Sequence, residues 1–258
     1  MKLISPAKIN LTLDILGKDE RVGKHFVNTV MYRYEDLYDE LSLTANQTAK
    51  NTVTMQGIQI PVTKSNTVFQ ALDLLGVRGW DIVIQKNIPV QSGLGGGSSN
   101  AASILKYFGE HKGIPLHELQ KLGAQIGADV PFFLCEEPLA YCEGFGDQLV
   151  QSWQIPKLSI NLLNTDVLVS TAEAYAGLDM KICGEESAKT EALLKVLNEK
   201  CSQSDKSIKE SPSQLLGRDL EQFFHNDFES QYFEQHPEWR GSGRLCGSGG
   251  MIFTISDG

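Results

Sequence analysis

The stretch Ile88–Ala102, IPVQSGLGGGSSNAA, decides how the whole chain is interpreted. The preceding run 80–85, WDIVIQ, is rich in β-forming residues that partly alternate with polar ones, which predicts a strand. In the run that follows, apolar residues from Ala101 to Phe108 recur at positions i, i+3, i+4 and i+7, the spacing of an amphipathic helix. The quoted stretch is therefore predicted to be a glycine-rich turn that joins a strand to a helix N-terminus.

Such a turn suits the binding of an anion, above all a polyphosphate. The first turn of a helix leaves backbone N–H groups without an intrahelical partner, and the helix dipole favours negative charge there. Glycine lets an anion approach the backbone closely because it has no Cβ. Ser98 and Ser99 are predicted at the cap positions, where their hydroxyls add hydrogen-bonding groups.

Two widespread phosphate loops do not match this stretch. A Walker loop is excluded because no GK[ST] follows the glycines, and the dinucleotide fingerprint lacks its acidic residue after the next strand. A turn that only lets a strand and a helix pack closely is the plainer alternative. The glycines are denser here than packing requires, so a phosphate site is favoured.

Composition narrows the class of protein. The 258 residues suit one large domain or two small ones, and 41% apolar residues are enough for a sizeable core. The net charge of −9 argues against nucleic acid as the main partner. The five cysteines are odd in number and form no CxxC pair, which indicates free thiols in a reducing compartment. The N-terminus lacks the apolar core of a signal peptide, and no run approaches the ~20 apolar residues of a membrane span, so we expect a cytoplasmic protein without a membrane partner.

Strand and helix patterns are interspersed along the chain without a regular βαβ period, which indicates α+β layering. A boundary near 151–157 divides it into an N-terminal domain, residues 1–154, and a C-terminal domain, residues 155–258. Within the first domain, 53–62 is expected to form a hairpin. Within the second, the polar segment 201–213 is expected to be a mobile linker.

Three further motifs carry chemistry when they are taken together. SPAKINLTL places Lys8 on the polar face of an alternating strand, with Asn10 and Thr12. GADVPFF contains Asp129, which alone would pass for a cap or turn residue. The glycine turn 247–249 alone would pass for an ordinary β-turn.

With the glycine loop between the first two, these motifs resemble those of the GHMP kinase superfamily, in order and over nearly the whole chain. Within it they resemble the 4-diphosphocytidyl-2-C-methyl-D-erythritol kinases. The resemblance implies a two-domain fold, with an N-terminal ribosomal-S5-domain-2-like part and a C-terminal ferredoxin-like layer. It also implies ATP-dependent phosphorylation of the 2-hydroxyl of that substrate, with Mg²⁺ as the partner of ATP, in the non-mevalonate route to isoprenoid precursors.

The resemblance also implies roles for individual residues. Lys8 and Asp129 would be catalytic, with Asp129 as the general base that accepts the proton of the acceptor hydroxyl. Nucleotide contacts would come from Asn66 and Lys86 and from the loop residues Pro89, Val90, Gln91, Ser92, Gly93, Leu94, Gly95, Gly96, Gly97, Ser98 and Ser99. Substrate contacts would come from Asn10, Lys24, His25, Phe145, Thr171 and Tyr175. A protein carboxylate that binds the metal is not assigned.

One departure from the family bears on the substrate. The family motif DGYH is Val22-Gly23-Lys24-His25 here, so the aromatic ring that would stack on cytosine is replaced by Lys24. Tyr175 could still stack on the other face of the base. Two alternatives therefore stay open: another small-molecule kinase of the superfamily, of the homoserine or mevalonate type, and a non-catalytic ATP-binding sensor on the same fold. The oligomeric state is also open.

Overall fold

A computed structural model describes residues 1–58, 63, 65–202 and 218–256. The chain forms two compact units that interleave in sequence. The first comprises Met1–Lys8, Arg33–Val90 and Leu94–Glu136, and the second comprises Ile9–Tyr32, Gln91–Gly93 and Glu137–Gly258. Both contain strands and helices, as the predicted α+β class requires. The division at residues 154 and 155 stays a prediction.

Two long strands run through both units. They are β1 (Lys2–Asp19) and β2 (Lys24–Ala45). In the first unit, β2 pairs antiparallel with β4 (Trp80–Lys86), and β4 pairs parallel with β3 (Thr52–Gly57). Leu41, Leu43, Ile82 and Ile84 are buried on this sheet because alternate side chains of a strand share one face.

The second half of the hairpin predicted at 53–62 lies outside the described residues, so the hairpin stays a prediction. The described half is part of β3, which pairs in parallel with β4, with Val53 opposite Ile82. The connection between the two strands passes through α1 (Thr67–Leu74). Residues 59–62 and 64 lie outside the described part of the chain.

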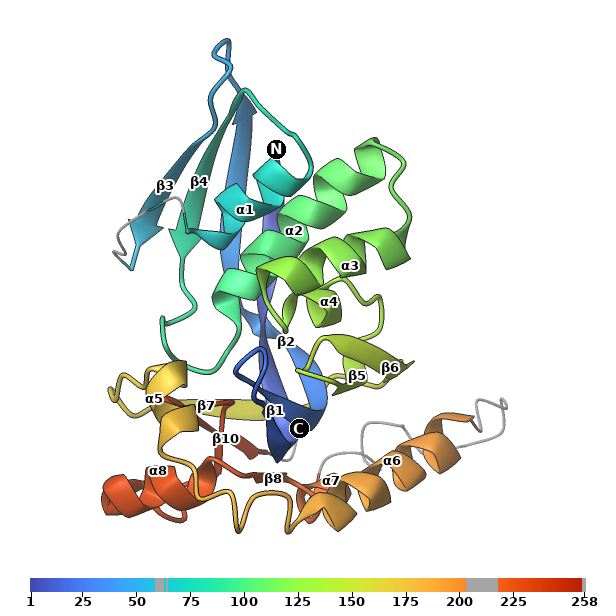
Figure 1. The fold of residues 1–258 in the computed structure, drawn as a ribbon, viewed down its shortest axis with the longest axis vertical. Coiled ribbons are helices and arrows are strands. Elements are labelled where there is room, and N and C mark those ends of the chain that lie inside the picture. The colour runs from blue at the N-terminus through green and yellow to red at the C-terminus, as the bar shows by residue number, and fades with distance from the viewer. Residues whose placement is uncertain (59–62, 64, 203–217, 257–258) are drawn as a thin grey trace. The chain divides into compact units, whose positions relative to one another are not determined.

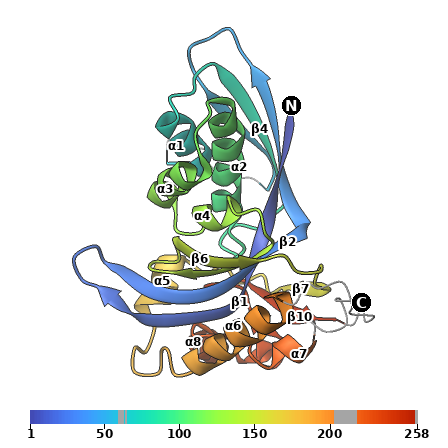
Figure 2. The ribbon, with the colours of Figure 1, turned by 90° about the vertical axis from the view of Figure 1, so that its right-hand side faces the viewer.

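Four helices cover one face of the first unit's strands, as Figures 1 and 2 show. They are α1, α2 (Gly96–His111), α3 (Leu116–Ile126) and the short α4 (Val130–Phe133). The Oδ1 of Asn66 caps α1 by accepting the N–H of Val68. The cap position predicted for Ser98 and Ser99 is wrong: Gly95, at φ 70°, precedes the helix without a side-chain cap, and both serines lie inside α2.

The second unit contains a separate three-stranded antiparallel sheet. In it, β10 (Met251–Ile255) lies between β7 (Ile160–Asn164) and β9 (Arg244–Leu245). The hairpin end of β1 and β2 also belongs to this unit, where β2 pairs with β5 (Leu139–Glu143) and β5 with β6 (Gln148–Trp153). On its other edge β1 pairs in parallel with the two-residue β8 (His225–Asn226).

Four α-helices lie in the described part of the second unit. They are α5 (Thr171–Ala176), α6 (Ser187–Ser202), α7 (Arg218–Glu221) and α8 (Glu229–Gln235), followed by a 3₁₀ turn at Pro237–Trp239. Most of the linker predicted at 201–213 lies outside the described residues; its first two residues end α6.

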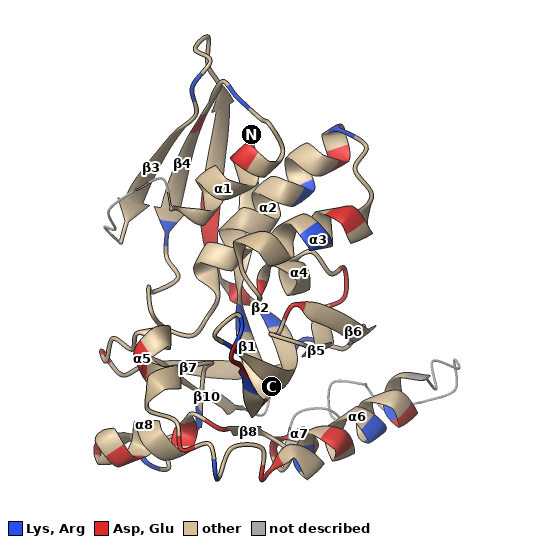
Figure 3. Ribbon diagram, in the orientation of Figure 1, with Lys and Arg blue, Asp and Glu red and all other residues tan. Residues whose placement is uncertain are grey.

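Acidic and basic residues are interspersed along α3 and α6 in Figure 3, the pattern of solvated helix faces. In the described part of the chain, no helix has both the length and the apolar character that a membrane span requires.

The polar face of β1 is buried rather than solvated. Asp14 has no exposed surface, and its two carboxylate oxygens accept hydrogen bonds from His225 Nε2 at 2.7 Å and Thr190 Oγ1 at 2.7 Å. His225 Nδ1 lies 3.0 Å from the carbonyl oxygen of Phe223. Both ring nitrogens thus face acceptors, which favours the doubly protonated imidazolium. This buried polar cluster joins β1, α6 and β8.

The cluster makes stability depend on pH. Burial lowers the pKa of His225. The hydrogen bonds to Asp14 and Phe223, together with the charges of Asp14 and Glu186, raise it by more than burial lowers it, so the pKa lies above its ordinary value. A histidine with a raised folded-state pKa contributes stability fully below its unfolded pKa of about 6.5 and loses that contribution as pH rises through the folded pKa.

We therefore predict that the wild-type protein loses free energy of unfolding relative to His225→Gln as pH rises from about 6.5. At pH 6 the substitution should cost on the order of 3–5 kcal/mol, because it leaves the Asp14 carboxylate without its charged partner. Urea unfolding of both proteins across this pH range measures the difference. A difference that stays constant with pH would contradict the imidazolium assignment.

Candidate active site

Lys8 and Asp129 meet in the first unit. The backbone N–H of Lys8 donates to the carbonyl of Leu94 at 3.0 Å, which joins β1 to the glycine loop. The Nζ of Lys8 lies 3.7 Å from Oδ2 of Asp129. The Lys8 side chain is 5% exposed and that of Asp129 is 32% exposed, so a buried ammonium faces a carboxylate that solvent or a ligand can reach.

Asp129 owes its position to the buried turn that follows it. It directly precedes α4, whose four residues Val130, Pro131, Phe132 and Phe133 are all buried. Proline suits the first turn of a helix because the missing N–H would have no intrahelical partner there. The apolar residues of GADVPFF therefore anchor the turn and leave Asp129 at its partly open end.

Gly95 brings the loop, the lysine and the α4 turn together. Its φ of 70° lies in the left-handed region, and an ideal Cβ would lie 3.0 Å from both Lys8 Cγ and Phe133 Cε2. A side chain here would be strained and would push on both neighbours. Glycine at this position therefore lets three segments distant in sequence pack around one backbone atom.

The first turn of α2 offers the remaining elements of an anion site. Gly97 is exposed, and its carbonyl accepts a hydrogen bond from Thr67 Oγ1 at 2.7 Å. An ideal Cβ at Gly97 would meet Thr67 Oγ1 only at 3.6 Å, an ordinary contact. The N–H groups of this turn have no intrahelical acceptor, so they are available to a ligand.

Near the start of α2, two buried polar atoms have no hydrogen-bond partner among the described residues, namely Oγ of Ser99 and Oδ1 of Asn100. A buried polar atom that lacks a partner is costly unless a ligand or solvent satisfies it. No cluster of three His, Cys, Asp or Glu that could hold a metal exists among the described residues. Ser99 Oγ, as a buried oxygen without a partner in the described part of the chain, is a candidate ligand for a metal that arrives with a phosphate.

Lys86 is buried in an ion pair that the sequence analysis missed. Its Nζ donates to Oδ2 of Asp39 at 2.6 Å, with 4% of the Lys86 side chain and none of the Asp39 side chain exposed. Burial lowers the pKa of Lys86, and the Asp39 charge opposes this shift. One signal could have revealed Asp39: it stands two residues before Leu41, on the face of β2 that is otherwise apolar.

The loop residues between Val90 and Leu94 belong to the second unit. Gln91 has a positive φ of 53°, and an ideal Cβ at Gly93 would lie only 1.8 Å from the carbonyl oxygen of Cys246. An ideal Cβ at Gly250 would lie 2.8 Å from the carbonyl oxygen of Gln91. The glycine turn 247–250 thus packs backbone to backbone against residues 91–93. Ser92 is buried, and Pro89 and Val90, in the first unit, are half-buried.

His25 packs against an aromatic ring of the second unit. The imidazole stacks on Tyr175, with ring centroids 4.7 Å apart and an interplanar angle of 14°, and Tyr175 meets Phe228 edge-on at 4.9 Å. Burial, together with the charge of Lys18, lowers the pKa of His25, and Glu20 opposes the shift. The ring is therefore mostly neutral at neutral pH, which leaves one nitrogen as a donor and the other as an acceptor.

Lys24 lies against a different ring. Its Nζ is 5.4 Å from the centroid of Phe145, which in turn stacks on Phe26 at 5.1 Å. This geometry is a cation–π contact. Thr171 Oγ1 lies 3.2 Å from Ser248 Oγ, and Asn10 Nδ2 donates to Thr29 Oγ1 at 2.8 Å. The predicted substrate residues Lys24, His25, Phe145, Thr171, Tyr175 and Asn10 all lie in the second unit.

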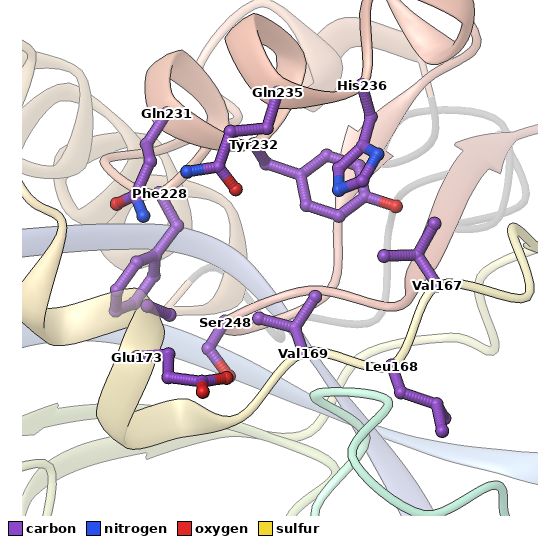
Figure 4. A pocket seen from close by; sticks show the side chains of 11 residues that line it. Val167, Leu168, Val169, Glu173, Phe228, Gln231, Tyr232, Gln235, His236 and Ser248 are labelled. Atoms are coloured by element: carbon purple, nitrogen blue, oxygen red, sulfur yellow. The ribbon is translucent and has the colours of Figure 1, made fainter.

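A cavity of about 270 Å³ lies in the second unit, and Glu173 of α5 is among the residues that line it (Figure 4). Its walls come from the segment after β7, from α8 and from the glycine turn, through residues such as Val169, Tyr232 and Ser248. Tyr232 is held by a hydrogen bond of 2.8 Å to Thr165, so this wall is fixed in position.

The family match and the similar proteins all point to the same family. Residues 64–137 match the family described as GHMP kinases N terminal domain. The 4-diphosphocytidyl-2-C-methyl-D-erythritol kinase of Syntrophus aciditrophicus is 34% identical over 99% of this chain and 89% of its own length. The kinase of the same description from Syntrophotalea carbinolica is 40% identical over 68% of this chain, and the match spans 64% of that protein.

The fold is similar to that of a solved 4-(cytidine 5'-diphospho)-2C-methyl-D-erythritol kinase. The TM-score is 0.72 at 26% sequence identity, and the similarity covers 100% of this chain and 91% of that one. The α+β fold of the GHMP kinases, predicted from the sequence, is thereby confirmed.

We predict that a methyl group added at Gly96 and one added at Gly97 have different effects on the protein. An ideal Cβ at Gly96 would lie 2.7 Å from Lys86 Nζ and 3.0 Å from Ile88 Cγ2, so Gly96→Ala should disturb the protein itself. Gly97→Ala meets no close protein atom, so the melting temperature should stay within about 2 °C of wild type. Calorimetry with ADP should nevertheless show weaker binding, because the methyl group stands where a phosphate would approach. Wild-type affinity in Gly97→Ala would remove this residue from the phosphate site.

Proposed function

The chain belongs to the family of 4-diphosphocytidyl-2-C-methyl-D-erythritol kinases, and on that premise we propose that it transfers the γ-phosphoryl group of ATP to the 2-hydroxyl of 4-diphosphocytidyl-2-C-methyl-D-erythritol. The observation that carries the proposal is the Lys8–Asp129 pair beside Gly95 of the glycine loop. A carboxylate, an ammonium and a phosphate-binding helix N-terminus are the groups that phosphoryl transfer to an alcohol requires.

In the proposed reaction, Asp129 accepts the proton of the acceptor hydroxyl as its oxygen bonds to the γ-phosphorus. The bond from that phosphorus to the β–γ bridging oxygen breaks, and ADP leaves. Lys8, held 3.7 Å from Asp129, places positive charge beside the oxygen that loses its proton. Most of the lowering of the barrier comes from positioning and from charge compensation around the phosphates.

The proposed nucleotide site uses backbone groups of the loop. The N–H groups of the first turn of α2 hold the phosphates, and Asn66, which caps α1, lies at the start of the helix whose Thr67 bonds Gly97. Mg²⁺ bound to the ATP would compensate phosphate charge. The buried, unpartnered Ser99 Oγ fits such an ion as a neutral oxygen ligand.

The proposed cytidine site uses the aromatic residues of the second unit. Tyr175 supplies a ring for stacking, and neutral His25 supplies one donor and one acceptor for the edge of cytosine. One face of Tyr175 is already covered by His25 in this structure. A base that stacks on that face must therefore displace the imidazole, which then becomes free to turn toward the base edge.

Another kinase of the superfamily is the second candidate, and a non-catalytic ATP sensor is the third. Retention of both Lys8 and Asp129 disfavours the sensor. A coupled assay of ADP release with a panel of alcohols separates all three. We expect turnover with the cytidyl substrate and not with homoserine or mevalonate. The reverse preference would support the second candidate, and ATP binding without turnover of any alcohol would support the third. A cytoplasmic location stays a prediction.

Asp129→Asn tests the role of the general base. The substitution preserves size but removes the charge that accepts the proton, so kcat should fall by a factor on the order of 10² or more. Affinity for ADP should stay close to wild type, because the loop around Gly95 is unchanged. Glu118→Gln, an acidic-to-amide change on α3, is the matched control and should retain wild-type kcat. Near-normal turnover of Asp129→Asn would exclude Asp129 as the base.

Lys24→Tyr tests how the cytosine is held. Stacking of a tyrosine on a base contributes roughly 1–3 kcal/mol, whereas an exposed lysine near a diphosphate contributes about 0–1 kcal/mol and is screened by salt. The variant should therefore have a lower KM for the cytidyl substrate, and this KM should depend less on ionic strength. The measurement is KM against salt concentration for both proteins. Equal KM values with the same salt dependence would mean that Lys24 only covers Phe145 and takes no part in binding.

A further inference from the structure

Asp39 is the residue around which the start of the glycine loop is ordered. Its Oδ1 accepts the backbone N–H groups of Asn87 at 2.8 Å and Ile88 at 2.9 Å. Its Oδ2 accepts Lys86 Nζ at 2.6 Å and Asn100 Nδ2 at 3.1 Å. A carboxylate offers about four lone-pair positions, so all of its accepting capacity is used.

The four donors come from both ends of the loop. Lys86, Asn87 and Ile88 are the end of β4 and the residues directly after it, where the chain leaves the sheet. Asn100 lies in the second turn of α2, beyond the glycines. A single buried side chain on β2 therefore joins the segment before the loop to the helix after it.

Lys86 is placed against the loop by the same contact. An ideal Cβ on Gly96 would lie 2.7 Å from Lys86 Nζ, so the ammonium lies directly beneath the first residue of α2. With 4% of its side chain exposed and its charge paired with Asp39, the ammonium is oriented toward the protein interior. From this position the Lys86 ammonium can support the backbone of the loop.

We propose that Asp39 is a positioning residue for the phosphate loop, and that Lys86 acts through its pair with Asp39 rather than by contact of its charge with the nucleotide. This inference rests on the proposed kinase function, since the loop geometry matters only if a nucleotide binds there. The alternative, which the family resemblance implies, is that Lys86 contacts ATP directly.

Asp39→Asn separates the charge of Asp39 from its shape. The remaining amide oxygen can still accept the N–H groups of Asn87 and Ile88, but the new NH₂ group faces two donors, Lys86 Nζ and Asn100 Nδ2. The ammonium is left buried without a partner and must move, which displaces Gly96 above it. We expect kcat/KM for ATP to fall by a factor on the order of 10², the effect of a misplaced binding group.

The double variant Asp39→Asn/Lys86→Met removes this conflict. Methionine fills the space without a charge. The Asn100 amide can rotate so that its Oδ1, which has no partner among the described residues of the wild type, accepts from the new NH₂ group. Under the positioning hypothesis, the double variant regains most of the kcat/KM that Asp39→Asn loses. Lys86→Met alone should lose less than Asp39→Asn, because the Asp39 carboxylate keeps three donors.

The comparison uses steady-state kinetics with varied ATP, calorimetry with ADP, and thermal unfolding of each full-length variant. Glu40→Gln is the matched control. It removes an acidic charge from the adjacent position of the same strand, where Glu40 forms an ion pair with exposed Lys2, and it should match wild type. If Asp39→Asn cannot be purified folded, the Lys86→Met and double variants still decide, because a direct nucleotide contact predicts a large, salt-dependent loss of ADP affinity in both.

The inference is overturned if the losses of the two single variants multiply in the double variant, or if Lys86→Met is as impaired as the double variant and more impaired than Asp39→Asn. These outcomes are distinct from failure of the proposed function. That failure appears in the wild-type protein itself, as an absence of ADP binding or of ATP turnover.

Discussion

The close packing around Gly95 is the constraint on which the proposed catalytic arrangement depends. At a φ of 70°, and with an ideal Cβ 3.0 Å from Lys8 Cγ and from Phe133 Cε2, the position admits only glycine without strain. The Lys8 N–H bond to Leu94 fixes the neighbouring peptide. Because Phe133 belongs to the same short helix that begins after Asp129, the acid and the ammonium are positioned by contacts with the loop that would hold the phosphate.

Much of this arrangement could be predicted from the sequence, since its parts are local patterns. The apolar periodicity from Ala101 to Phe108 gave α2, and the Asn before residue 67 marks the start of α1. Features that depend on pairing between strands distant in sequence could not be predicted in this way. Alternation at 53–57 predicts a strand equally well whether its neighbour runs parallel or antiparallel, so the parallel pairing of β3 with β4 could not be inferred.

The partners of the buried polar residues could not be predicted from the sequence either. Alternation along β1 indicated a polar face with Lys8, Asn10 and Asp14, and such a face is normally solvated. In the structure it is buried, because each polar group meets a specific partner: Asp129 for Lys8, Thr29 for Asn10, and His225 for Asp14. Partners 19 to 211 residues away leave no local trace in the sequence.

The pairing of these charges also bears on how a chain with a net charge of −9 would bind phosphate at the proposed site. The protein carries a net charge of −9, and in the first unit the two lysines nearest the loop are already opposed by carboxylates, Lys8 by Asp129 and Lys86 by Asp39. Because both ammonium groups are paired with carboxylates, lysine charge would contribute little to the binding of phosphate. The attraction for phosphate must come chiefly from the oriented N–H groups at the start of α2, whose effect acts over a short range and is independent of net charge. A site of this kind would depend on the position of the backbone more than on the number of basic residues, so single residues that fix the backbone, such as Gly95 and the buried carboxylate of Asp39, would have a large effect on it.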